Sequence, residues 1–235
     1  TSNRDMKDFQ KDLGLRINQS NLCSEIQLPT DSYNSFVCCL GSLNLLHWDE
    51  IKQTDAIETY TLFLNAVMDE FITKAAVLPG MARAHRFAER HRAIGLGVLG
   101  YHSYLQSKLV EFESMQAKML NVEIFKTIKE KSDNTSKMLC EAKDVMSIRP
   151  GFANTTLVAI APTKSSSFIH GQVSMGIEPI KSNYFIKDLA KSKTVYKNPF
   201  LEAELDKYGL NTPETWDSIL KKDGSVQHLD FPTKA

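Results

Sequence analysis

The chain has 235 residues, and its 28 Lys and Arg residues balance its 28 Asp and Glu residues. A hydrophobic share of 42% is typical of soluble globular proteins and excludes a disordered chain. The zero net charge disfavours a strongly basic nucleic-acid binder. No apolar run approaches the roughly 18 residues that span a bilayer, and the polar start carries no signal peptide. Four cysteines do not make a disulfide scaffold, so we expect a cytoplasmic protein with no membrane or nucleic-acid partner.

The first half of the chain alternates short apolar runs with helical patterns. The apolar run 36–40 (FVCCL) is typical of a buried strand. Residues 49–76 have apolar side chains at helical spacing and are expected to form a helix that Asp55 or Thr54 can cap. Pro79 and Gly80 end this helix, and a second, basic helix is expected over 81–90.

A glycine-rich segment, 95–100 (GLGVLG), matches the GxGxxG pattern of dinucleotide-binding loops. That fingerprint should follow an apolar strand and precede an acidic residue about 20 positions later. Here it follows Arg90-His91-Arg92, and position 120 is Leu. A nicotinamide-dependent dehydrogenase is therefore a weak hypothesis, and small residues that allow close helix packing are the favoured interpretation.

The second half predicts one or two long helices over 113–146, whose Met-rich stripe is expected to lie in the core. The β-branched run 156–161 is typical of a strand buried on both faces. A polar loop follows at 162–167, then a short strand at 184–186 and a capped helix at 212–222. Long helices between short buried strands indicate an α/β fold.

An amide, a thiol and a carboxylate alternate at Asn21, Cys23 and Glu25. Alternate residues of an extended segment share a side, so these three groups are expected around one point. A nearby carboxylate disfavours a thiolate, so the pattern argues against a Cys–His type nucleophile. It suits a thiol that works beside a separate acid or base. From spacing alone, a half-buried loop cysteine without function is the commoner case.

The other cysteines give weaker signals. Cys38 and Cys39 are neighbours, and a disulfide between adjacent strand residues is strained, so one of them could instead pair with a distant cysteine. Cys140 falls in the long helical segment and is expected in the core. Zinc sites need about four ligands at short recurring spacings. There is no CxxC motif and the six histidines are scattered, so no metal site is expected.

The loop 162–167 (PTKSSS) leaves a predicted strand with several hydroxyls, a lysine and free backbone amides. Ligands in open α/β folds bind at the carboxyl ends of strands, and backbone amides at helix N-termini bind phosphate. A phosphate site is one interpretation of this loop. An ordinary serine-rich turn is the other.

Five segments together resemble a known family, the catalytic large subunit of class I ribonucleotide reductase. The first two are 21–26 (NLCSEI) and 38–45 (CCLGSLNL). The others are 92–98 (RAIGLGV), 161–167 (APTKSSS) and 176–179 (GIEP). The five segments occur in the same order as in the family. The sequence near Cys38 and at 182–184 is most similar to the forms carried by large bacteriophages.

The resemblance implies a ten-stranded α/β barrel of two five-stranded halves, with a cysteine-bearing finger loop at its centre. Cys23 would carry a thiyl radical that abstracts the ribose 3′-hydrogen, and Glu25 would accept the 3′-hydroxyl proton. Asn21 would bind substrate, and Cys38 would be one of two cysteines that reduce it. The residues implied in diphosphate binding are Thr163, Lys164, Ser165 and Ser166. Lys164 stands where many bacterial relatives have an acidic residue.

The same resemblance implies partners outside this chain. It covers neither an ATP-binding N-terminal region, nor the first barrel half with the partner of Cys38, nor the C-terminal tyrosines and tail cysteines. We therefore expect residues 1–235 to form a single partial catalytic domain with no cofactor of its own. A separate metal-containing small subunit would supply the radical, and thioredoxin or glutaredoxin the electrons. The alternative is a non-catalytic remnant or partner piece that keeps the fold without radical chemistry. The base preference cannot be predicted, since effector loops set it in the family.

Overall fold

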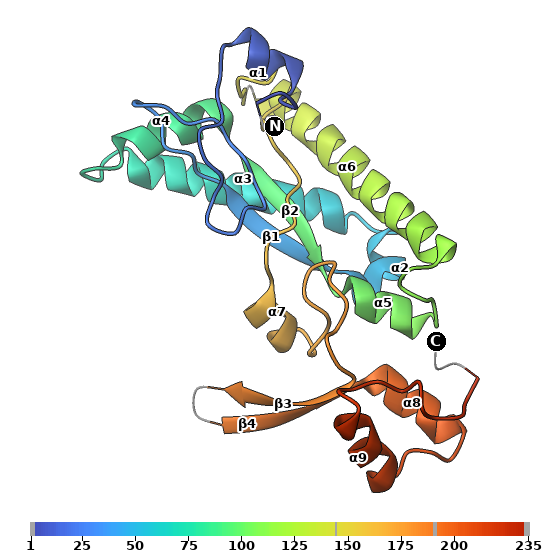
Figure 1. The fold of residues 1–235 in the computed structure, drawn as a ribbon. Helices are drawn as coiled ribbons and strands as arrows, with labels where there is room; N and C mark the ends of the chain where they lie inside the picture. Colours follow the sequence, from blue (N-terminus) through green and yellow to red (C-terminus); the bar gives the residue numbers. More distant parts are fainter. Residues whose placement is uncertain (1–2, 144, 190–191, 233–235) are drawn as a thin grey trace.

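The structure, a computed structural model, describes residues 3–143, 145–189 and 192–232. A larger α/β body is followed by a smaller body of two strands and two helices (Figure 1). The elements of the larger body are α1 (Asp8–Asp12), β1 (Cys39–Asn44), a 3₁₀ turn (Leu45–His47), α2 (Trp48–Ile51), α3 (Ala56–Ala75), α4 (Ala82–His91), β2 (Ile94–Leu99), α5 (Tyr101–Ser107), α6 (Met115–Lys143) and α7 (Lys164–Ile169). The smaller body contains β3 (Tyr184–Leu189), β4 (Ser192–Lys197), α8 (Pro199–Lys207) and α9 (Pro213–Lys221).

A parallel pair of strands crosses the middle of the larger body (Figure 1). β1 pairs with β2 in the register Cys39 to Ile94 through Asn44 to Leu99. Every residue of β2 is buried, whereas β1 is only partly covered. The strand expected over 36–40 was misplaced, because strand pairing begins only at Cys39, whose amide donates to the carbonyl of Ala93.

The segment expected as a strand over 156–161 lies on the other side of β2. It makes one parallel bridge, between Val158 and Leu96, and the amide of Leu96 donates to the carbonyl of Leu157 at 2.8 Å. Leu157 and Ala159 are buried, while Val158 and Ile160 are half-buried. The expectation of a regular strand buried on both faces was therefore wrong, because only one side of this segment faces the core.

The glycines of 95–100 allow close approach of strands, which corrects the expectation of close helix packing. A Cβ atom on Gly97 would stand 2.3 Å from the carbonyl oxygen of Ala159, and one on Gly95 would stand 2.8 Å from the Cβ of Ala159. Only Gly100, with φ +79°, stands at the turn between β2 and α5. Two of the three glycines thus lie inside a strand, unlike those of a dinucleotide loop.

A buried polar network fixes the point where α4 passes into β2. Arg92 has φ +45° and is 7% exposed, and its guanidinium donates to the carboxylate of Asp69 and to Oδ1 of Asn65. Nδ2 of Asn154 donates to the same Asn65 oxygen and to the carbonyl of Arg92. Oδ1 of Asn154 accepts from the hydroxyl of Ser136 on α6. The network therefore ties α3, α6 and the 153–155 segment to the start of β2.

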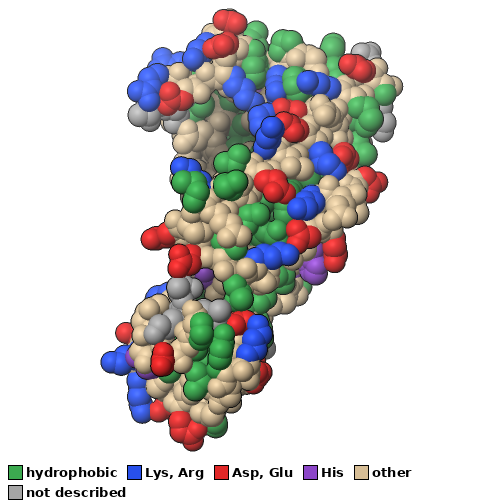
Figure 2. Space-filling view, turned by 90° about the vertical axis from the view of Figure 1, so that its right-hand side faces the viewer, with side chains coloured by type: hydrophobic (Ala, Val, Ile, Leu, Met, Phe, Trp, Pro, Cys, Tyr) green, Lys and Arg blue, Asp and Glu red, His purple; other side chains and the backbone are tan. Residues whose placement is uncertain are grey.

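The long helices cover the parallel pair. The helix expected over 49–76 is divided into α2 and α3, and the predicted helix over 113–146 is the single helix α6. Ile124 and Ile128 of α6 are buried in the main core. Met115, Met119 and Val122 are each more than half exposed, so the expectation that the Met stripe lies in the core was wrong. The apolar stripe turns away from the contact between α6 and α3, and hydrophobic side chains reach the surface on this side of the molecule (Figure 2).

The smaller body has its own apolar cluster. Trp216 and Ile219 of α9 pack with Leu201 and Leu205 of α8. β3 and β4 form an antiparallel hairpin, which confirms the strand expected at 184–186. The hydroxyl of Thr212 accepts from the amide of Thr215, so the predicted cap of the last helix is also present.

Gly97→Ala is expected to destabilise the fold, because the new methyl group meets backbone atoms that cannot rotate away. Overpacking of this kind costs about 1–3 kcal/mol or more. Urea unfolding would measure the loss of free energy. Ser42→Ala changes the residue paired with Gly97 and is the control, with little expected effect. Equal stability of Gly97→Ala and the parent chain would contradict the close approach.

His91 is expected to make stability depend on pH. Burial, followed by the nearby charge of Arg90, lowers its pKa to about 4, and its ring stacks on Phe87 with centroids 4.0 Å apart. The unfolded chain takes up this proton at higher pH than the folded chain. The contribution of the neutral His91 ring to the free energy of unfolding is therefore complete above about pH 6.5 and is lost as the pH falls toward 4. Linkage gives a loss of about 2 kcal/mol at pH 5 relative to pH 8. His91→Phe should remove this part of the pH dependence in urea unfolding, and an unchanged dependence would contradict the assignment.

Candidate functional site

Cys23 stands on a short turn that Asn21 closes. The side-chain oxygen of Asn21 accepts from the amide of Ile26 at 3.2 Å, and its carbonyl accepts from the amide of Ser24. Ser24 has φ +62°, so the segment turns instead of running extended. Cys23 is exposed, whereas Ile26 is buried and anchors the turn. This geometry leaves the thiol accessible and commits the Asn21 oxygen to the loop.

Glu25 belongs to the same turn and is half-buried. The carboxylate atom Oε2 is buried and makes no hydrogen bond with the described residues. Burial raises the pKa of the Cys38 thiol far above its usual value, and the charges of Cys39 and Glu25 raise it further. The Cys38 thiol therefore stays protonated at neutral pH.

The two adjacent cysteines belong to different clusters. Cys38 packs with a small cluster that includes Ile26, Leu28 and Ala159, while Cys39 packs against the main core. All four cysteines are free thiols. The neighbouring thiols therefore do not act together on one face, as the alternation of a strand predicts.

The segment 162–167 was predicted as a polar loop, but it is helical from Lys164 on, where α7 begins with Thr163 as its N-cap. Ser165 and Ser166 are exposed on the first turn of this helix, and Lys164 is exposed beside them. Thr163 is only 5% exposed, and its hydroxyl accepts from the amide of Gly176 at 2.9 Å and shares a hydrogen bond with Ser167. The Thr163 hydroxyl thus bonds within the protein, whereas the side chains of residues 164–166 are exposed to solvent.

A cavity of about 180 Å³ brings Cys23 to this loop. Its lining is Cys23, residues 160–164 and residues 175–178. Three expected site residues, Cys23, Thr163 and Lys164, therefore share one cavity. The other expected residues, Asn21, Glu25, Cys38, Ser165 and Ser166, do not line it. Cys38 adjoins Ala159, the residue before Ile160 of the cavity wall.

Sequence reasoning missed the functional importance of the turn 175–178. It gives the cavity a second charged group, Glu178, besides Lys164, and two apolar side chains, Met175 and Ile177. The turn was noticed only as a family landmark. Its own residues carried no chemical signal, because a Gly-Ile-Glu-Pro turn is common at a surface.

Across residues 3–143, 145–189 and 192–232, no cluster of three or more His, Cys, Asp or Glu side chains could hold a metal ion. In the same ranges, no helix is long and apolar enough to cross a membrane.

A family model described as the barrel domain of ribonucleotide reductase matches residues 1–148 and 146–235. The chain belongs to this family. The five sequence segments thus gave the correct family, and the predicted α/β class is confirmed as part of its barrel domain.

Individual relatives support the same family. The large subunit of ribonucleoside-diphosphate reductase from Invertebrate iridescent virus 3 is 40% identical over 98% of this chain and 37% of its own length. A putative large subunit from Frog virus 3 is 37% identical over 97% of this chain and 41% of its own length. The class Id alpha subunit from Actinobacillus ureae superposes with a TM-score of 0.90 at 52% identity, over 97% of this chain and 42% of that one. The chain therefore spans about two fifths of these relatives.

Alkylation should distinguish the two site cysteines. At pH 8, iodoacetamide is expected to modify Cys23 at least about tenfold faster than Cys38, because Cys23 is exposed and burial keeps Cys38 protonated. Peptide mapping by mass spectrometry would give both rates. In urea the two rates should become similar. Equal rates in the folded chain would contradict the burial of Cys38.

Proposed function

We propose that this chain is a catalytic segment of ribonucleoside-diphosphate reductase, which converts ribonucleotides to deoxyribonucleotides. The main support is the cavity that Cys23 shares with Thr163 and Lys164. In it, an exposed thiol stands beside a cation and a serine-bearing helix start. Glu25 of the Cys23 turn adds an acid–base group, and Cys38, which packs with Ile26 and Ala159, adds a second thiol next to the same segment.

Each residue has a role in the proposed reaction. A thiyl radical at Cys23 takes the hydrogen atom from C3′ of the ribose, so an S–H bond forms and a C–H bond breaks. Glu25 accepts the 3′-hydroxyl proton, which helps the 2′-hydroxyl to leave as water. Cys38 and a second thiol supply two electrons and two protons and become a disulfide. Cys23 then returns the hydrogen atom to C3′ and regains the radical.

The exposed part of the phosphate loop suits a diphosphate. Lys164 offers a positive charge, and Ser165 and Ser166 offer hydroxyls and backbone amides at the start of α7. Charge-assisted hydrogen bonds of this type are about twice as strong as neutral ones. Thr163 would act indirectly, by holding the segment in place, because its hydroxyl already accepts a hydrogen bond from the Gly176 amide. Asn21 would contact the substrate through its amide nitrogen, since its oxygen closes the Cys23 turn.

The reaction also needs groups from other polypeptides. Cys39 faces the main core and cannot join Cys38, so the second reducing thiol must come from elsewhere. We propose that residues 1–235 act as one partial catalytic domain together with the rest of a large subunit. A radical-generating small subunit and thioredoxin or glutaredoxin would complete the system in the cytoplasm.

The isolated chain is expected to show no ribonucleotide reduction, even with a small subunit. A chimera in which this chain replaces the matching segment of the class Id alpha subunit should reduce cytidine diphosphate. Cys23→Ser should abolish that turnover, at least about 10³-fold, because no other group can carry the radical. Cys140→Ser, on α6 and not in the lining of the Cys23 cavity, is the matched control and should keep activity.

The same experiment separates the alternatives. Turnover by the isolated chain would overturn the proposal of a partial domain. Turnover that survives Cys23→Ser would overturn the role of Cys23. A folded chimera that binds the diphosphate without turnover would favour the non-catalytic piece.

A further inference from the structure

The start of α5 holds the segment that forms one wall of the Cys23 cavity. The amide of Gly100 donates to the carbonyl of Ser174 at 2.8 Å. Ser103 and Ser174 exchange hydrogen bonds, each backbone amide donating to the other's hydroxyl, at 3.2 and 2.9 Å. Both serines are at most 2% exposed. This reciprocal pair fixes the beginning of the 174–180 segment in a water-free position.

His102 holds the end of the same segment. The amide of Ile180 donates to Nδ1 of His102 at 3.1 Å. An imidazole nitrogen can accept only when it carries no proton, so the remaining proton of the neutral ring is on Nε2. Burial lowers the pKa of His102, which keeps the ring neutral. The ring of Phe112 lies nearly perpendicular to it, with the ring centroids 5.6 Å apart. The histidine thus acts as a fixed acceptor.

The cavity wall lies between these two attachment points. Gly176, in its middle, donates its amide to Thr163 and so connects the wall to the phosphate loop. Ile177 and Glu178 of the wall face the cavity that contains Cys23. A shift of Ile180 would therefore move the groups that shape this cavity.

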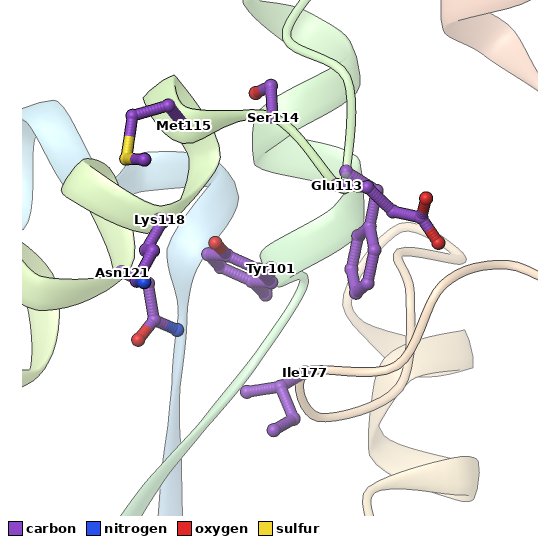
Figure 3. Close-up of a pocket in the computed structure, with 8 residues that line it drawn as sticks. Tyr101, Glu113, Ser114, Met115, Lys118, Asn121 and Ile177 are labelled. Carbon is purple, nitrogen blue, oxygen red and sulfur yellow. The ribbon is translucent and has the colours of Figure 1, made fainter.

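Ile177 of the wall also borders open space. It lines a second, open cavity of about 470 Å³ together with Tyr101, Phe112 and residues before and at the start of α6 (Figure 3). Side chains beside an unfilled space lose contacts that would otherwise fix them. The position of the 175–178 turn consequently depends on its hydrogen bonds to α5 and to Thr163.

We propose that His102 is a positioning residue for the Cys23 cavity, and that it acts by accepting the Ile180 amide. In this role His102 does not contact the ligand itself. It fixes the position of the 174–180 segment, part of which lines the cavity. The identity of the ligand, a nucleoside diphosphate, rests on the proposed function, but the effect of His102 on the wall does not.

Two polar substitutions test the acceptor. His102→Asn places an oxygen where Nδ1 stands, whereas His102→Gln places one where Nε2 stands, out of reach of Ile180. Amide exchange by NMR should show Ile180 and Gly176 about tenfold faster in the Gln variant and near the parent rate in the Asn variant, since a net hydrogen bond is worth about one decade. The amide of Leu96 on β2 is the internal reference. His85→Gln, at a half-buried histidine of α4, is the matched control.

Affinity for adenosine diphosphate, measured by calorimetry on the same proteins, gives the functional readout. The Gln variant should bind about tenfold more weakly, and the Asn and His85→Gln variants within about twofold of the parent chain. Parent affinity in the Gln variant, or weak binding in the Asn variant with a protected Ile180, would overturn the proposal. If the parent chain does not bind the nucleotide, the ligand assignment fails. Exchange at Gly176, which does not contact His102, then decides the positioning role: an unchanged rate in the Gln variant overturns it.

Discussion

The close contact between Gly97 and the carbonyl of Ala159 is the constraint on which the site depends. It lets three chain segments run side by side, with β2 in the middle, β1 on one side and residues 156–159 on the other. Cys38 directly precedes β1, and the chain that continues from 156–159 supplies residues 160–164 of the cavity lining. A larger side chain at position 97 would separate these segments. The small residue is thus required by the chemistry of the site as much as by the core.

Two buried hydroxyls, those of Thr163 and Ser167, separate the residues of 163–167 that bond within the protein from those that are exposed. Thr163 and Ser167 point inward, bond to each other and reach Gly176 and Ser174. The three residues between them, Lys164 to Ser166, stay exposed. Alternation of this kind is a property of one helical turn, since residues four apart share a face. Of five consecutive polar residues, two therefore bond within the protein and three are exposed, and the exposed ones are those that the proposed function offers to an anion.

Sequence reasoning predicted the helices with strong periodic patterns well, but it missed α5, α7 and α8 and misplaced β1. α4, α6 and α9 have strong periodic patterns and clear end signals, and they were predicted nearly as found. β1 was misplaced, because its start depends on a partner 55 positions away, Ile94, and not on the apolar run itself. The exposure of Met115 and the burial of Thr163 could not be predicted either, since each depends on what packs nearby in space. The site residues Cys23 and Lys164 came from family motifs, whereas His102 lies outside every motif and was found only from its contact with Ile180.

The positions of the thiols make the proposed reaction a shared one. Reduction of a ribonucleotide consumes two thiols at one place. Cys38 is half-buried and packs with Ile26 and Ala159, Cys39 packs against the main core, and in the proposed reaction Cys23 carries the radical. The second thiol has to approach Cys38 from a side that this chain leaves open. Within the described residues β1 pairs only with β2, so its other edge is such a side. An open strand edge readily accepts another strand, and in the proposed reaction the polypeptide that pairs there would also bring the missing thiol.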